Sequence, residues 1–197
     1  MSTSEDTGRR LSGVQLAAGL ITVLVMGFLV LLATQEVERD GVNFGVVGQP
    51  APAVRAVSYQ GDTFELDAVV QDNTVAPPDQ QTWVVLNFFG SWCVGCIEEH
   101  DELVRFDQEG ARSAVGLECR TELIGVTFDD TEENVIEFFA DRGGEWPVLV
   151  GEGTNAAVVA YGVTAAPETI VVAPNGLVAA KFAGPITYEQ LTRVIQC

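Results

Sequence analysis

Apolar residues are concentrated first in a long N-terminal run. Leu11 to Ala33 contains no charged residue. As a helix these 23 residues would be about 34 Å long, enough to cross a hydrocarbon core of about 30 Å. Arg9 and Arg10 precede the run and acidic residues follow it. The positive-inside rule therefore predicts a transmembrane anchor at 11–33, with residues 1–10 in the cytoplasm and the rest of the chain outside.

A cleaved signal peptide is the alternative interpretation of this segment. Its apolar region would normally be shorter, about 7–15 residues, and an A-x-A-like site would follow it. Leu31 stands two residues before Ala33, so such a site is poor. Both interpretations export the remainder, which consists of a linker at 34–50 rich in Gly and Pro and one domain at 51–197.

Within the exported domain, short apolar runs alternate with stretches of helical periodicity. Trp83–Phe89 is nearly continuous in apolar residues, as is typical of a strand buried on both faces. The remaining predicted elements are a hairpin (Val54–Ser58, Thr63–Leu66), a loop (Gln71–Gln81), a helix (about Val94 to Glu109, ended by Gly110), a strand (Leu123–Phe128), a helix (Asp130 or Thr131 to about Arg142, with Val135, Ile136, Phe138 and Phe139 on its apolar side), a short helix (Asn155–Tyr161), two strands (Glu168–Ala173, Leu177–Ala183) and a last helix.

Turn and cap signals join these elements into an α/β fold. Asn175-Gly176 is a strong hairpin signal between the last two strands. Thr187-x-x-Gln190 is a capping box that opens the C-terminal helix. A β-α-β crossover implies parallel strands, and the hairpins add antiparallel ones. We therefore expect a mixed central sheet with helices on both faces.

Charge and composition exclude several function classes. The chain has 10 basic and 28 acidic residues and a net charge of −18, so it lacks the basic surplus that nucleic-acid binding requires. Lys181 is its one lysine, and His100 is its one histidine. A single histidine excludes any metal site that needs two His ligands. Charges in the first 35 residues cancel, so the exported part carries the −18, which indicates a solvated, self-repelling surface.

Chemistry is concentrated in Cys93-Val94-Gly95-Cys96, between the strand Trp83–Phe89 and the next helix. At a helix N-terminus the backbone N–H groups and the dipole favour the Cys93 thiolate. Cys93 would be the exposed nucleophile, and Cys96 would resolve the mixed disulfide. A c-type haem site would need His after the second cysteine, where Ile97 stands, and zinc would need further ligands. An inert structural disulfide remains the serious alternative.

Two segments carry a family resemblance. Residues 87–100, with the sequence NFFGSWCVGCIEEH, resemble the N-F-W-A/G-S/T-W-C-x-x-C-x-x-E pattern of the thioredoxin-like thiol-disulfide oxidoreductases of the TlpA, ResA and CcmG group. Residues 161–169, with the sequence YGVTAAPET, resemble the group's Y-G-V-x-G-x-P-E-T. The resemblance covers about residues 47–196 and implies a thioredoxin-like fold, in which Asp129–Val150 matches the group's helical insertion.

The resemblance also implies site residues. Pro167 should be cis and face the cysteine pair, the Ala166 backbone should pair with an extended substrate, and Trp92 should contact that substrate. Glu99 and Glu168 correspond to acids that the family places near the disulfide, where a carboxylate can move protons and shift a thiol pKa.

From the residues alone, alternatives stay open. Pro167 would be an ordinary loop proline, and Glu99 would lie on a solvated helix face. His100 is interpreted as a helix-surface or partner-contacting residue. The family often has proline inside its C-x-x-C, where Val94-Gly95 stands, and glycine where Ala165 stands; these departures bear on redox potential and substrate.

Cys119 and Cys197 lie outside the motif. In the fold that the resemblance implies, both fall at the pole opposite the active site. We predict a structural disulfide between them that closes a 79-residue loop, worth about 2–4 kcal/mol. The alternative is two independent thiols.

The apolar run and the resemblance together predict a membrane-anchored extracytoplasmic enzyme, whose redox group is the Cys93–Cys96 disulfide. We expect no metal and no bound cofactor. Its expected substrate is the C-x-x-C-H thiol pair of apocytochrome c during cytochrome c maturation, with electrons from a membrane thiol donor. The alternatives are a general disulfide reductase or oxidase for other exported proteins, and a non-catalytic binding module. Copper delivery and peroxiredoxin chemistry are disfavoured because their cysteine patterns are missing from the sequence.

Overall fold

The computed structural model describes residues 19, 21, 22, 24–28, 45–112 and 118–196. The chain divides into two compact units, Met1–Glu38 and Arg39–Cys197. In the first unit the described residues are helical, and the rest of the predicted anchor at 11–33 lies outside the described residues. Among the helices that the structure describes, none combines the length and the apolar character that a membrane span needs.

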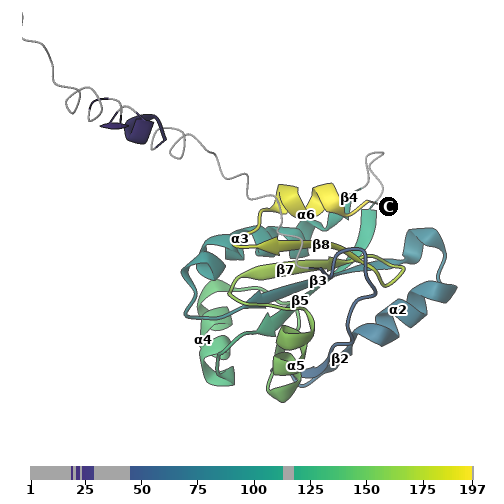
Figure 1. Cartoon of the computed structure of the whole chain (residues 1–197). Coiled ribbons are helices and arrows are strands. Elements are labelled where there is room, and N and C mark those ends of the chain that lie inside the picture. The colour runs from purple at the N-terminus through teal and green to yellow at the C-terminus, as the bar shows by residue number, and fades with distance from the viewer. Residues whose placement is uncertain (1–18, 20, 23, 29–44, 113–117, 197) are drawn as a thin grey trace, which may run out of the picture. The chain divides into compact units, whose positions relative to one another are not determined.

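A mixed sheet forms the centre of the second unit, with the strand order β2-β1-β6-β5-β3-β7-β8 and with β4 paired to β5 (Figure 1). Strand β3 lies parallel to β5 and antiparallel to β7, so it is flanked on both sides. The strands are β1 (Arg55–Ser58), β2 (Thr63–Glu65), β3 (Thr82–Phe89), β4 (Ala111–Arg112), β5 (Glu118–Thr127), β6 (Val148–Val150), β7 (Glu168–Val172) and β8 (Val178–Ala183).

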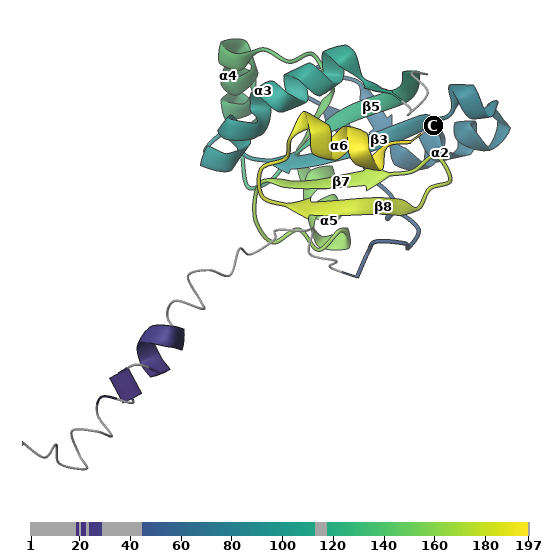
Figure 2. The same cartoon turned by 90° about the horizontal axis from the view of Figure 1, so that it is seen from above.

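Helices cover both faces of this sheet. Helices α3 and α6 lie over one face and α2 and α5 over the other (Figures 1 and 2). The helices are α2 (Leu66–Val75), α3 (Val94–Glu109), α4 (Glu132–Arg142), α5 (Glu152–Ala160) and α6 (Tyr188–Val194), with a 3-10 turn at Pro78–Gln80. The architecture is therefore the predicted α/β fold, a mixed central sheet with helices on both faces.

The alternation of side chains along β3 builds the two halves of the core. Val85 and Phe89 pack with Phe106 on the face covered by α3 and α6. Leu86 and Phe88 pack on the opposite face, with α2 and α5. Successive strand residues point to opposite faces, so a strand covered by helices on both sides must be apolar throughout. This explains the continuous apolar run in the sequence.

Several predicted boundaries are confirmed. Helix α3 spans Val94–Glu109 and ends at Gly110, whose φ of 63° is accessible to glycine at little cost. Thr131 caps α4 by accepting a hydrogen bond from the Asn134 N–H, and the helix ends before Gly143. Strand β5 begins at Glu118 and α5 at Glu152, earlier than predicted.

The predicted loop at Gln71–Gln81 is wrong in its first half. Residues up to Val75 continue helix α2. Their polarity belongs to an exposed helix face, and Asn73 turns inward, where its side chain donates to the Thr82 carbonyl and accepts from the Thr82 N–H. The helix ends at Ala76, which is extended as the residue before Pro77 must be.

Two further differences lie in the inserted segment. The sequence did not indicate β6, a three-residue strand that pairs with β5 and with β1 and so joins the N-terminal hairpin to the sheet. Ile136 was expected on the apolar side of α4 but is 46% exposed, because Val135, Phe138 and Phe139 already fill the buried face.

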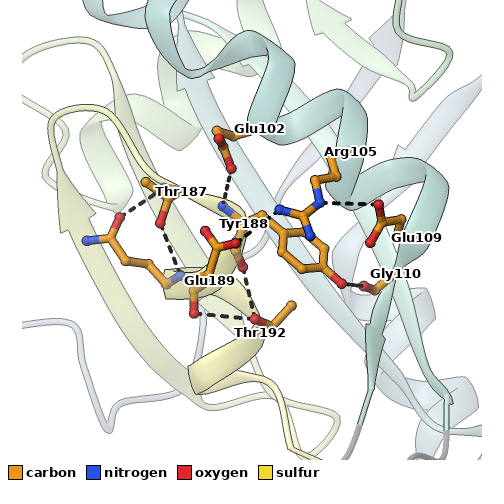
Figure 3. A network of polar contacts seen from close by, with 9 residues as sticks. Glu102, Arg105, Glu109, Gly110, Thr187, Tyr188, Glu189 and Thr192 are labelled. Carbon is orange, nitrogen blue, oxygen red and sulfur yellow. Dashed lines mark hydrogen bonds and ion pairs between the residues drawn. The ribbon is translucent and has the colours of Figure 1, made fainter.

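A polar network fixes α6 onto α3 (Figure 3). The Tyr188 N–H donates to Glu102, and the Tyr188 hydroxyl donates to the Gly110 carbonyl. The Arg105 guanidinium stacks over the Tyr188 ring at 4.0 Å and bridges Glu109 and Glu189. These contacts hold the start of α6, where the predicted capping box is formed.

We predict that Thr187→Ala lowers the free energy of unfolding by about 1 kcal/mol, because it removes the hydroxyl that accepts from the Gln190 N–H. Thr192→Ala is the control in the same helix, since its hydroxyl donates only to helix carbonyls. Urea unfolding should show the loss for Thr187→Ala and a smaller one for Thr192→Ala. Equal losses would contradict the assignment of the cap.

Candidate active site

The two cysteines of the C-x-x-C motif lie where β3 gives way to α3. After Phe89 the chain turns, with the Cys93 N–H donating to the Gly90 carbonyl, and Cys93 becomes the N-cap of α3. Cys93 and Cys96 are joined by a disulfide, with their Cα atoms 5.2 Å apart. The Cys93 sulfur accepts a hydrogen bond from the Cys96 N–H at 3.1 Å, so a backbone donor is aimed at the atom that would carry thiolate charge.

Both cysteines are largely covered in this disulfide form. Cys93 is 5% exposed and Cys96 is 3% exposed, so the expected exposed nucleophile presents only a small surface. The neighbouring Trp92 and Val94, by contrast, are 55% and 70% exposed, so an exposed apolar side chain stands on each side of Cys93 in the sequence.

Trp92 is held in place by the turn before the cysteines. Its indole N–H donates to the Asp129 carbonyl, and its ring lies 6.5 Å from that of Phe128. The indole also covers Gly90, where an added Cβ would stand 2.7 Å from the indole nitrogen. Glycine at position 90 is therefore a condition for this orientation of Trp92.

Two prolines pack against the C-x-x-C motif. The Ala166–Pro167 peptide bond is cis. A Cβ added at Gly95 would lie 3.1 Å from the Pro167 ring and 3.0 Å from the Pro185 ring. Pro167 thus faces the cysteine pair across Gly95, and its carbonyl accepts a hydrogen bond from the Gly184 N–H. Ala166 also packs against the core cluster that contains both cysteines.

Glu99 is buried, which contradicts the interpretation of a solvated helix face. Its side chain is 1% exposed, three residues after Cys96 on the same side of α3. One carboxylate oxygen accepts from the Asn87 side chain at 2.7 Å and the other from the Ile186 N–H at 2.8 Å. Burial raises the pKa of Glu99 to about 7, and these two hydrogen bonds partly oppose the rise.

Asn87 and Thr169 belong to this site, although the sequence analysis assigned them no role. Asn87 is buried in β3 and donates to both Glu99 and the Thr169 hydroxyl. A single amide within an otherwise apolar strand was the available signal, because a buried amide needs partners. Asn87 therefore connects the active-site helix to strands β3 and β7.

Glu168 is also buried, but its contacts lie on the other face of the sheet. It pairs in register with Phe88, whereas its neighbour Thr169 pairs with Asn87. Thr169 and Asn87 face α3, so Glu168 faces the opposite side of the sheet. Its carboxylate forms an ion pair with Lys181. Of the two acids that the resemblance associates with the disulfide, the structure brings Glu99 onto the α3 side and Glu168 onto the other.

His100 is buried, contrary to the interpretation of a surface residue. It is 3% exposed, and its ring lies 5.0 Å from Phe138 and 5.4 Å from Trp146. Its Nε2 is 2.9 Å from the Gly143 carbonyl. Burial is the main cause that lowers its pKa. His100 thus connects α3 to the end of α4.

Of the two remaining cysteines, the structure describes Cys119 alone. Cys119 is 7% exposed and pairs with Ala111 between β5 and β4. Cys197 lies outside the described residues, so the bond between the two stays a prediction. In the described ranges, no group of three or more His, Cys, Asp or Glu side chains is arranged to hold a metal ion.

Comparisons with known proteins point in one direction. A family model described as Redoxin matches residues 46–195. The thiol:disulfide interchange protein HelX of Rhodobacter capsulatus is 28% identical over 163 residues, 83% of this chain and 82% of the relative. A DsbE homolog of Paracoccus denitrificans is 26% identical over 79% of this chain and 76% of its own. The crystal structure of a DsbF homologue from Corynebacterium diphtheriae shares the fold, with a TM-score of 0.59, 23% identity and coverage of 82% of this chain and 94% of that one.

The raised pKa of Glu99 predicts a pH dependence of stability. The folded carboxyl binds its proton up to about pH 7, whereas the unfolded one loses it near 4.5. The folded state therefore holds more protons in this window, and the contribution of Glu99 to stability falls as pH rises through it, by about 3 kcal/mol in all.

This is measured as the difference in unfolding free energy between the protein and Glu99→Gln at pH values from 4.5 to 8. The protein should lose stability relative to the variant up to about pH 7 and then stay level. Glu98→Gln, one residue away on the exposed side of α3, is the control and should leave the difference flat. A flat curve for Glu99→Gln as well would refute the raised pKa.

Proposed function

The chain belongs to the Redoxin family of thioredoxin-like thiol-disulfide oxidoreductases, and from this we propose that it reduces disulfides of exported proteins, with the oxidised C-x-x-C-H segment of apocytochrome c as its substrate. In this proposal the domain works outside the cytoplasm in cytochrome c maturation. Residues 11–33 anchor it in the membrane, and a membrane thiol donor reduces it again.

The contact between the C-x-x-C motif and Pro167 carries the proposal. Cys93 caps α3, Gly95 lies against the Pro167 ring, and Ala166 packs beside the cysteines. An extended peptide can add to the chain at Ala166 through main-chain hydrogen bonds. It would then run past Cys93, with the apolar surface of Trp92 and Val94 next to it. An inert structural disulfide explains none of these features.

Reduction proceeds in two thiol-disulfide exchanges. The Cys93 thiolate attacks one sulfur of the substrate disulfide, which forms a mixed disulfide and releases the other substrate sulfur as a thiolate. Cys96, as thiolate, then attacks the Cys93 sulfur, which forms the Cys93–Cys96 bond and releases the second substrate thiolate. Two electrons and two protons pass from the enzyme dithiol to the substrate, and a reduced dithiol of the donor restores the enzyme by the reverse exchange.

Glu99 is the proton acceptor for the second exchange. Cys96 must lose its proton in a nearly closed site, and Glu99 lies on the same side of α3 within the same buried layer. With a pKa of about 7 the carboxyl takes and returns a proton at neutral pH with little energetic cost. Its hydrogen bonds from Asn87 and Ile186 keep it oriented while its charge changes.

The membrane anchor determines where this chemistry takes place. Its uncharged 23-residue segment is preceded by Arg9 and Arg10, an arrangement that retains the N-terminus inside. A tether keeps the domain at high local concentration near membrane-bound donors and substrates. The surplus of acidic residues in the exported part keeps that domain soluble at the membrane surface.

We predict that Cys96→Ser accumulates mixed disulfides through Cys93, because the resolving thiol is missing. Non-reducing gels followed by mass spectrometry should identify trapped proteins that carry C-x-x-C-H segments. Cys93→Ser, which lacks the attacking thiol, is the matched control and should trap none of them. Trapped proteins without such segments would remove the apocytochrome assignment and leave a general disulfide reductase.

The direction of electron flow is tested by the reduction potential of the Cys93–Cys96 pair. We expect the pair to be mostly disulfide at equilibrium with a glutathione buffer, because a reductant must give up its electrons readily. Alkylation of free thiols with a mass tag, across a range of glutathione ratios, gives the midpoint. A midpoint well above that of glutathione would make the protein an oxidant and reject the reductant proposal.

A further inference from the structure

Lys181 is the one lysine of the chain, and it is buried. It lies in β8, with a side chain that is 0% exposed. Lysine is rarely buried unless its charge is compensated. Its charge is compensated by the Glu168 carboxylate, which forms an ion pair with Nζ at 2.8 Å. Nζ also donates hydrogen bonds to the Tyr161 carbonyl at 2.8 Å and to the Gly162 carbonyl at 2.9 Å.

The two carbonyls give this lysine a definite place in the fold. Tyr161 is the C-cap of α5, where carbonyls lack helical partners and the helix dipole is negative. A cation at this end therefore stabilises the helix end. Lys181 thus ties the end of α5 to β8, and it does so at the start of the segment that leads to the cis proline.

Glu168 holds the rest of that segment. One carboxylate oxygen takes the ion pair with Lys181. The other accepts from the Thr164 N–H at 2.9 Å and from the Ala165 N–H at 3.3 Å. Between them, the two side chains bind backbone groups at four of the five positions from 161 to 165. Ala166 and Pro167 follow directly.

This arrangement differs from the role that the resemblance implies for Glu168. Its carboxylate is on the α5 side of the sheet, paired in register with Phe88, while Glu99 is on the α3 side with Asn87. The contacts of Glu168 shape the backbone that precedes Pro167. A charge held by an ammonium on the other face of the sheet is poorly placed to tune thiols.

We propose that Glu168 and Lys181 are positioning residues for substrate recognition: their buried ion pair fixes the 161–165 loop and so sets where Ala166 and Pro167 lie against the C-x-x-C motif. This inference rests on the proposed function, since it assumes that a peptide pairs at Ala166. The Pro167 ring is in contact with Gly95, so a shift of the loop changes the alignment of a bound peptide with Cys93. A small-molecule disulfide has no peptide main chain, so its reaction with Cys93 does not depend on pairing at Ala166.

The test compares two kinds of substrate on the full-length chain. The double variant Lys181→Met, Glu168→Gln removes both charges while it keeps side-chain volume, a replacement that buried ion pairs often tolerate. We expect kcat/KM for peptide disulfides to fall on the order of tenfold or more, mainly through KM, since misplacement by about 1 Å can cost about 10²-fold. The rate with the small aromatic disulfide DTNB should change less than about twofold. The pH dependence of that rate should stay the same.

Two controls separate positioning from stability and from thiol tuning. Leu66→Ala opens a cavity at helix α2, on a different element of the same core layer. It should destabilise the fold but change the rates with peptide disulfides and with DTNB to the same extent. Lys181→Arg keeps the charge but replaces a three-donor point charge by a planar fork. It should give the same selective loss, to a smaller degree, even if the double variant does not fold.

Three outcomes would overturn the inference. Equal losses for peptide and small disulfide, matched by Leu66→Ala, would show a purely structural pair. A shifted pH profile or reduction potential in Glu168→Gln would show that Glu168 tunes the thiols. Unchanged peptide kinetics in both Lys181 variants would show that the loop holds without the pair.

Failure of the proposed function would look different. Each variant is measured with two peptide disulfides, one of C-x-x-C-H sequence and one unrelated. If the unaltered protein reduces both equally well, the apocytochrome proposal fails. The positioning inference is then still tested, because both peptides dock through the same loop.

Discussion

The buried carboxylate of Glu99 is the contact through which the pieces of the active site are held in register. It belongs to α3, accepts from Asn87 in β3, and accepts from the Ile186 N–H in the segment after β8. A buried carboxylate without partners would cost several kcal/mol, so each of the three segments is bound to the position of the others. The cysteines at the start of α3, and Pro185 beside Gly95, are placed by the same requirement.

The central sheet separates two kinds of acidic residue. Glu99 has no cation among its hydrogen-bond partners and keeps a pKa of about 7, which suits it for proton transfer. Glu168 is paired with an ammonium and serves as an acceptor for backbone N–H groups. Glu99 reaches the sheet from α3 and contacts Asn87 in β3. Glu168 lies in β7 itself and points to the opposite face, because successive residues of a strand alternate between the two faces.

Sequence patterns predicted the elements that are governed by local rules and missed what depends on tertiary contacts. The strand Trp83–Phe89, the stop at Gly110 and the caps at Thr131 and Thr187 follow from side-chain chemistry that acts over a few residues. The polar half of α2 and the short β6 depend on partners far along the chain. Burial of Glu99 and His100 was predictable in principle: with Cys96, Leu103 and Phe106 they form one helical stripe at spacings of three and four. Their charge led to the opposite interpretation, although the spacing was the better guide.

The burial of Lys181 has a consequence for the chemistry of the protein surface. Because the chain has one lysine and its side chain is fully enclosed, the folded domain offers no lysine ε-amine to acylating reagents or to enzymes that modify lysine. Its exposed cations are guanidinium groups, which such reagents leave alone. The ε-amine becomes accessible only when β8 separates from the end of α5, so acylation of Lys181 is an intrinsic reporter of that opening.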